Sequence, residues 1–413
     1  MAENCRKFIS LITWIKDSGC VARTDGAHLD ERHPFPLGHR RTDSSGTRAQ
    51  YLPAGYVPKV ERRPDPGHCG GDSDRCNCYR RLVRTAPAAS RDRAISRSLG
   101  ADAPWVITFA AVTVVELAIW GTDWRLGFAP EPYLLSYLCI AVAGLIVASS
   151  LRLIFRRGSM VVNWLSLFAG TLLVGIGASI FLPLKYAIPA IVPFWLDQPL
   201  AHAERALFGA DPWLLLDRWL GWADVPIDRL YGLWLPTQTL VLFVVMLQPA
   251  SSAKSRVLIA YVLGWFLLGV VAALAFSSAG PLFYDRLLGA NEFASLRQTL
   301  IDRGAWVALA ESDKMWTSLA TGRPGFVAGI SAVPSIHVAI SFWYVLAARQ
   351  LAPRAAALGL FYTAVIWAGS VQLGWHYVSD GLAGILGMLA IWPLSTRLEQ
   401  ALTGRMKSDS SPG

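Results

Sequence analysis

The chain has 413 residues, of which 53% are hydrophobic and 16% are charged, whereas soluble domains carry about 25% charged residues. It contains 17 Trp, a residue type favoured at membrane interfaces. The composition excludes a disordered chain, a coiled coil and an ordinary cytosolic enzyme, and it indicates a membrane protein of several spans with a polar extension.

The first hundred residues differ from the rest. They hold 18 of the 38 Lys and Arg and 11 of the 29 Asp and Glu, so most of the net charge of +9 lies there. Residues 17–100 are rich in Arg, Pro, Gly, Ser and Asp without a sustained period, and such a segment buries too little apolar surface to offset chain entropy. We predict a disordered basic cytoplasmic tail over residues 1–100, with an over-extended gene start as the open alternative.

Five of the six cysteines also lie in this tail: Cys5, Cys20, Cys69, Cys76 and Cys78. Their spacing matches no pair of Cys-x-x-Cys knuckles, which favours free thiols over a metal site. We therefore predict no metal and no cofactor.

From Pro104 onward, apolar runs alternate with short polar breaks. A membrane-spanning helix needs about 20 apolar residues and satisfies its own backbone groups, so these runs predict an all-α bundle of about eight transmembrane spans. The bundle forms a membrane-embedded domain over residues 101–400, and residues 401–413 form a cytoplasmic C-terminal tail. The expected spans lie near residues 104–121, 133–154, 161–183, 231–249, 257–277, 334–352, 355–374 and 380–396.

The short loops indicate the orientation of the chain. Alternate loops carry Arg and Lys, and the rule that positive residues stay inside puts these loops in the cytoplasm. The long segments 184–230 and 278–333 then face the opposite side, which is periplasmic or lumenal. We expect a multi-pass protein of a bacterial inner membrane. The basic loop residues are Arg152, Arg156, Arg157, Lys254, Arg256, Arg349, Arg354, Arg397, Arg405 and Lys407.

Segment 184–230 is too apolar for a plain loop. Its Trp and Leu residues predict interfacial helices on the outer leaflet, which either cover the bundle or grip lipid. Within it, Asp211-Pro212 predicts a helix start with Asp as the cap and Pro in the first turn.

Three histidines lie outside the tail, namely His202, His337 and His376, and the predicted topology puts all three near one face of the membrane. His337 starts the sixth expected span, and His376 follows the seventh. Ionisable residues at the ends of spans are costly and usually functional. Since the two spans are antiparallel neighbours, these ends can meet.

Other polar residues extend this group. Asp380 follows His376 by four residues, which puts both on one face of a helix. A carboxylate bonded to one ring nitrogen leaves the other nitrogen as a nucleophile or base. Arg323 lies on the same predicted side and could hold an anionic oxygen. Ser335 and the first amides of the sixth span would form an anion site. The set suits attack on a phosphoryl group, although a helix pair with a capped, buried His is the plain alternative.

These residues resemble the type 2 phosphatidic acid phosphatase superfamily. Its motifs are Lys-x6-Arg-Pro, Pro-Ser-Gly-His and Ser-Arg-x5-His-x3-Asp, and the matching segments here are 323–324, 334–337 and 376–380. The forms Pro-Ser-x-His and His-Tyr-x-x-Asp, with the run from Asp197 to Pro212, are more similar to the inositolphosphotransferase branch, which includes inositolphosphorylceramide synthases. The resemblance covers about residues 180–396.

The resemblance implies a role for each residue. His376 would take the phosphoryl group as a phosphohistidine, Asp380 would orient it, and His337 would protonate the leaving group. Arg323 and Ser335 would hold the phosphate oxygens without a metal. The Arg of the third motif is missing, Ser370 stands six residues before His376, and Lys314 is out of register with the first motif. Lys185 is the other candidate for that phosphate-binding charge.

The resemblance thus implies an integral membrane lipid phosphatase or head-group phosphotransferase. Hydrolysis and transfer share one intermediate and differ in the acceptor. Its partners would be a lipid phosphate or phospholipid and the bilayer, with no nucleic acid. The alternatives are a transporter or scaffold with a degenerate site, and a serine hydrolase built on Ser335 and His376.

Overall fold

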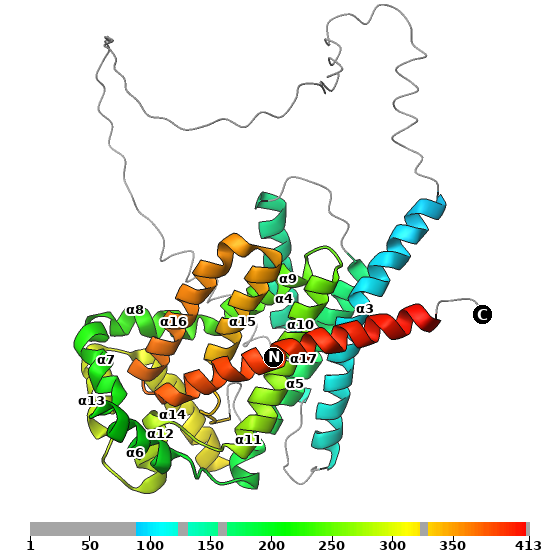
Figure 1. The fold of residues 1–413 in the computed structure, drawn as a ribbon. Coiled ribbons are helices and arrows are strands. Elements are labelled where there is room, and N and C mark those ends of the chain that lie inside the picture. The colour runs from blue at the N-terminus through cyan, green and yellow to red at the C-terminus, as the bar shows by residue number, and fades with distance from the viewer. Residues whose placement is uncertain (1–87, 123–130, 156–162, 323–328, 410–413) are drawn as a thin grey trace, which may run out of the picture. The chain divides into compact units, whose positions relative to one another are not determined.

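The computed structural model describes residues 88–122, 131–155, 163–322 and 329–409, and all regular structure in these residues is helical (Figure 1). The predicted all-α class is therefore confirmed. Arg323, Pro324 and the cysteines of the predicted tail lie outside the described residues. The long helices are α3 (Ala88–Thr122), α4 (Glu131–Phe155), α5 (Trp164–Ile191), α9 (Trp234–Met246), α10 (Ser252–Phe266) with η3 (Leu267–Ala272) and α11 (Ala273–Ala275), α15 (Ile336–Leu351), α16 (Ala356–Gln372) and α17 (Val378–Asp409).

Six of these helical stretches are long and apolar enough to cross a membrane. They are 100–121, 134–154, 164–191, 252–275, 353–372 and 378–406. The segment 212–232 and helix α9 pass the same test together but are bent by 47°, so the described residues hold up to seven spans. The multi-pass membrane protein expected from the sequence is thus supported.

Helix α15 explains the difference from the eight expected spans. It has 16 residues, which corresponds to a length of about 24 Å. Val338, Ala339, Ile340 and Trp343 have no exposed surface, so the helix is apolar because it forms the core of the bundle. Length and hydropathy in the sequence do not distinguish such a core helix from one that meets lipid.

The helices around α15 form the centre of the structure. Helix α15 packs on α10, α16 and α17, and α10 also packs on α17, while α4 packs on α5 and α9. Gly384 allows α17 to approach α15 closely, because a Cβ at this position would lie 2.6 Å from the carbonyl oxygen of Ser335. The first turns of α15 and α17 are therefore held side by side.

Short helices form the two long segments between spans. The first segment contains α6 (Asp197–Phe208), α7 (Pro212–Leu220), η2 (Gly221–Ala223) and α8 (Asp224–Gly232), and the second contains α12 (Pro281–Leu288), α13 (Ala294–Arg303) and α14 (Trp306–Thr321). The two segments pack on one another, α6 on α12 and α8 on α13 and α14, and α7 and α8 also pack on α16.

Ion pairs and caps fasten these short helices. Arg303 pairs with Asp217 and with Asp224, the latter at 2.9 Å, and Gln372 of α16 donates to both carboxylates. The Asp228 carboxylate accepts hydrogen bonds from two backbone amides in the first turn of α14. Both segments are thus tied to the end of α16.

Segment 184–230 contains exposed Trp residues and a helix that starts after Asp211, and both were predicted. Trp219 and Trp222 are 79% and 85% exposed, as interfacial residues would be. Helix α7 begins at Pro212 after Asp211, as predicted. The Asp211 carboxylate, however, caps no amide of α7 and instead accepts a hydrogen bond from Arg205 at 2.5 Å.

A buried ion pair joins α3 to α10. Lys254 donates to Asp102 at 3.1 Å, and the two side chains are 2% and 0% exposed. The Lys254 ammonium also lies 5.6 Å from the ring centroid of Trp105. Because each charge is shielded from solvent, each depends on the other for compensation.

The Lys254→Met variant should lower the free energy of unfolding by about 3–5 kcal/mol, since it leaves the Asp102 carboxylate buried without its counter-charge. The measurement is thermal or denaturant unfolding of the purified protein in detergent. Lys314→Met is the matched control, because Lys314 is 66% exposed in its pair with Glu311. Equal stability of the two variants would contradict this account.

Candidate active site

The chain between α16 and α17 carries His376. Helix α16 ends at Gln372, and Gly374 turns the chain with a φ of 72°. The amides of Trp375 and His376 donate to the carbonyl of Ser370, at 2.9 and 3.2 Å. His376 therefore lies in a tight loop before α17, and not on the helix that the four-residue spacing predicted.

Asp380, in the first turn of α17, nevertheless meets His376. Its Oδ2 lies 3.3 Å from His376 Nδ1 and also accepts the amide of Tyr377 at 2.9 Å. The Asp380 carbonyl accepts the amide of Ser335 at 2.9 Å. His376 is 5% exposed and Asp380 is 0% exposed. This contact fixes the orientation of the imidazole and leaves Nδ1 as the nitrogen that faces the carboxylate.

His337, the second residue of α15, lies opposite His376. The centroids of the two rings are 5.9 Å apart. Tyr231 stacks on the His337 ring with a centroid distance of 4.9 Å, and Trp234 lies at 4.2 Å. Trp234 Nε1 also donates to the carbonyl of His337 at 3.1 Å. Two aromatic side chains from α8 and α9, which the sequence analysis missed, therefore hold this histidine in place.

Ser335 precedes α15 and is fully buried. Its hydroxyl oxygen accepts a hydrogen bond from the amide of Val338 at 3.4 Å, so the side chain caps the helix. If Ser335 binds phosphate, as predicted, its hydroxyl must do so while it also caps α15.

Lys185 approaches the histidines from α5. It lines a cavity together with Gly329 and His337. Burial lowers the pKa of His376 from 6.5 to about 3, the positive charge of Lys185 acts in the same direction, and a hydrogen bond with the backbone of Ala332 opposes the shift. His376 is therefore a neutral imidazole at neutral pH, as a nucleophile must be.

The remaining candidates lie elsewhere. Lys314 pairs with Glu311 at 2.6 Å on the surface of α14. His202 is exposed on α6. The cluster within the described residues thus consists of His337, His376, Asp380, Ser335 and Lys185.

Two buried carboxylates on α6, also missed from the sequence, hold the loops beside His376. Asp197 accepts hydrogen bonds from the Ser278 hydroxyl and the amides of Ala279 and Gly280, at 2.7–2.9 Å. Glu204 accepts both the amide and the hydroxyl of Ser379, at 2.7 and 2.8 Å. The seven-residue spacing of Asp197 and Glu204 puts them on one face of a helix. This spacing is the feature of the sequence from which the pair could have been predicted.

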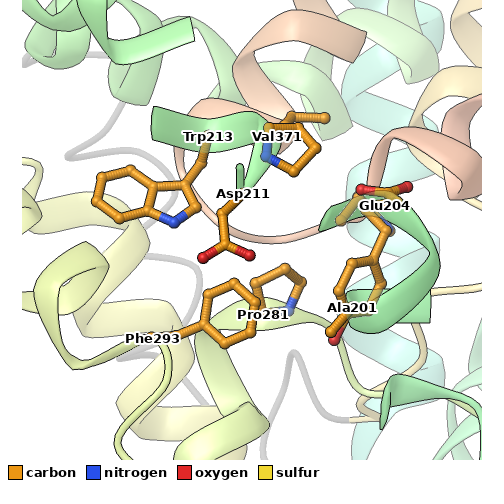
Figure 2. Close-up of a pocket in the computed structure, with 10 residues that line it drawn as sticks. Ala201, Glu204, Asp211, Trp213, Pro281, Phe293 and Val371 are labelled. Carbon is orange, nitrogen blue, oxygen red and sulfur yellow. The ribbon is translucent and has the colours of Figure 1, made fainter. Parts of the chain in front are cut away.

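A small pocket lies behind His376, on the side of α6 and α7. Figure 2 shows the side chains of Asp211, Trp213 and Phe293 gathered in it, with Glu204 nearby. Its lining also includes His376 and Tyr377. His376 therefore borders this pocket and also lies next to His337.

Residues 198–394 match the family model of the PAP2 superfamily. The matched segment contains His337, His376 and Asp380. It begins after Lys185 and therefore does not include helices α3 to α5. The match supports a phosphatase-type function on lipid phosphates, and it does not identify the inositolphosphotransferase branch. No curated protein and no solved structure shows significant similarity to the chain.

Gly280 allows the loop at Trp375 to pass close to α12. Its φ of 95° and ψ of 165° are accessible essentially to glycine alone, and a Cβ would lie 2.4 Å from the carbonyl oxygen of Trp375. Gly280→Ala should therefore destabilise the protein by more than about 2 kcal/mol. Unfolding in detergent measures the effect.

Gly289→Ala is the control for Gly280→Ala. Gly289 also has a positive φ, 64°, but no atom lies within 4 Å of its added Cβ. It should cost about 1 kcal/mol, from backbone strain alone. Equal losses in the two variants would show that the approach to Trp375 is unimportant.

Proposed function

We propose that the protein is a membrane-embedded enzyme that removes the phosphoryl group of a lipid phosphate through a phosphohistidine at His376. The observation that carries this proposal is the meeting of His337 and His376, with Asp380 bonded to His376, inside the segment that matches the PAP2 superfamily. The chemistry belongs to the class in which positioning and charge stabilisation supply most of the catalysis.

The proposed reaction has two steps. In the first, Nε2 of His376 attacks phosphorus, the bond from phosphorus to the lipid oxygen breaks, and His337, which the bound anionic phosphate keeps protonated, gives its proton to that oxygen. In the second, neutral His337 takes a proton from water, the water oxygen attacks phosphorus, and the bond from phosphorus to nitrogen breaks. Asp380 accepts the hydrogen bond from Nδ1 and stabilises the positive charge that develops on His376.

Cations and amides would hold the phosphate oxygens. Lys185 is suited to this role, because it lies beside His337 and has no ion-pair partner among the described residues. The amides at the start of α15 supply a partial positive charge. Arg323 completes the proposed set by its match to the family motif.

The acceptor decides between a phosphatase and a head-group transferase. Water and an alcohol can enter the second step in the same way, since each provides an oxygen nucleophile and one proton. The positively charged loops on the opposite side of the bundle support a site that faces the periplasm or a lumen.

Replacing His376 with Ala should lower kcat by at least about a thousandfold, because the group that carries the phosphoryl is removed. The measurement is phosphate and head-group release from a panel of lipid phosphates and phosphodiesters, with and without added alcohols such as inositol. His202→Ala is the control, since His202 is exposed on α6 and should leave the rate unchanged. Undiminished turnover by His376→Ala would contradict the phosphohistidine and favour a scaffold with a degenerate site.

Replacing Lys185 with Met should raise KM about tenfold, because one charged contact to the phosphate is lost. The steady-state kinetics of the same lipid phosphate measure the change. Lys314→Met should leave KM as it is, since Lys314 pairs with Glu311 on the surface. An unchanged KM in Lys185→Met would remove Lys185 from the phosphate site.

A further inference from the structure

A cavity of about 240 Å³ lies inside the helical bundle next to His337. Side chains of α3, α4, α5, α9 and α10 form its walls, and most of them are apolar, such as Phe109, Ile140, Leu173 and Phe181. Lys185 and His337 line the same cavity. Two residues of the candidate site thus border this largely apolar cavity.

About half of the residues that line the cavity come from helices that the family match does not include. Helices α3, α4 and α5 all precede residue 198, where the match begins. The N-terminal helices therefore contribute one side of the cavity, and the matched segment contributes the other.

Glu116 of α3 is the unexpected group in this lining. It is 4% exposed, and within the described part of the chain no side chain or backbone group pairs with it. A Cβ on Gly177 of α5 would lie 3.8 Å from Glu116 Oε2 and 3.6 Å from the hydroxyl of Thr113. A buried carboxyl group without a partner is costly in a membrane protein and indicates a ligand that supplies one.

Three neighbouring polar side chains are hydrogen-bonded to one another and do not pair with Glu116. Tyr261 donates to Gln238 at 2.6 Å, and Gln238 donates to Thr239 at 3.0 Å. These three side chains, which also line the cavity, therefore satisfy one another. Glu116 remains without a partner among the described residues, and so does Nε1 of Trp265, which lines the same cavity.

The spacing along α5 gives the geometry of that occupant. Gly177, which lies against Glu116, and Lys185 are eight residues apart on one helix, which corresponds to about 12 Å. The ligand must place an anion near Lys185, an apolar stretch beyond it, and a polar group at the level of Glu116.

We propose that this cavity binds one hydrocarbon chain of the lipid substrate, and that Glu116 forms a hydrogen bond with a hydroxyl group carried partway along that chain. The proposal rests on the proposed function for the position of the phosphate at Lys185 and His337. A hydroxyl fits Glu116 in either protonation state, because it both donates and accepts a hydrogen bond. The N-terminal helices thereby select the lipid, and the PAP2-like segment carries out the chemistry.

The test measures binding separately from turnover. The full chain carrying His376→Ala, which cannot consume the substrate, is purified in detergent. Its affinity for long-chain lipid phosphates that differ only in the presence and position of a chain hydroxyl is measured by native mass spectrometry. The best hydroxylated lipid should bind at least tenfold more tightly than the unsubstituted one, which corresponds to about 1.4 kcal/mol.

Two further substitutions in this background locate the interaction. Glu116→Leu should reduce the preference for the hydroxyl to less than twofold and leave the affinity for the unsubstituted lipid unchanged. Gly177→Leu should weaken the binding of both lipids at least tenfold, because its side chain fills part of the cavity. Gly177→Ala is its control, since the added Cβ would make only ordinary contacts. Leu173→Trp narrows the cavity independently if Gly177→Leu fails to fold.

Equal affinity for hydroxylated and unsubstituted lipids in the protein that retains Glu116 would overturn the role of Glu116. Unaltered binding in folded Gly177→Leu and Leu173→Trp would overturn the cavity as the chain site. With His376 intact, Gly177→Leu should still release phosphate from a short-chain phosphate. If the unsubstituted enzyme releases none from any lipid while the binding pattern holds, the proposed chemistry fails and the cavity assignment stands.

Discussion

The candidate site depends on one buried carboxylate. Asp380 contacts the His376 ring and the Tyr377 amide through the same oxygen, and its carbonyl accepts the amide of Ser335. These contacts join the first turn of α17 to the start of α15, which carries His337. A single residue thus fixes the orientation of one histidine and the distance to the other. Burial strengthens these interactions, because no water competes for the carboxylate.

The short helices between the spans also hold the loop of His376 and the start of α17 in place. Asp197 holds the loop at Ser278 to Gly280, and Glu204 holds Ser379, one residue before Asp380. Asp224 joins Arg303 to Gln372 at the end of α16. Buried acidic side chains therefore connect irregular backbone to helix ends, where unpaired amides would otherwise remain. The loop with His376 is held on both sides by such contacts.

The sequence predicted the helices well, because apolar runs of spanning length have few alternatives to a helix in a membrane. The conjunction of His337, His376 and Asp380 was also accessible, since spacing and topology bring the ends of neighbouring helices together. The loop conformation of His376 was not, because it depends on Gly374 and on a carbonyl of α16. The contacts of Tyr231 and Trp234 with His337 arise from packing between distant segments. The shortness of α15 and the Arg205 contact of Asp211 likewise follow from tertiary structure rather than local pattern.

The start of the family match at residue 198 has a consequence for how such a protein can diversify. The candidate residues His337, His376 and Asp380 lie after this point, and part of the cavity lining, including Phe109, Glu116 and Leu173, lies before it. Mutations in the earlier helices can reshape the interior without touching the hydrogen bonds of Asp380. Under the proposed function, exchange of α3 and α4 between homologous genes, which leaves Lys185 of α5 in place, would give descendants with new lipid preferences and an inherited reaction.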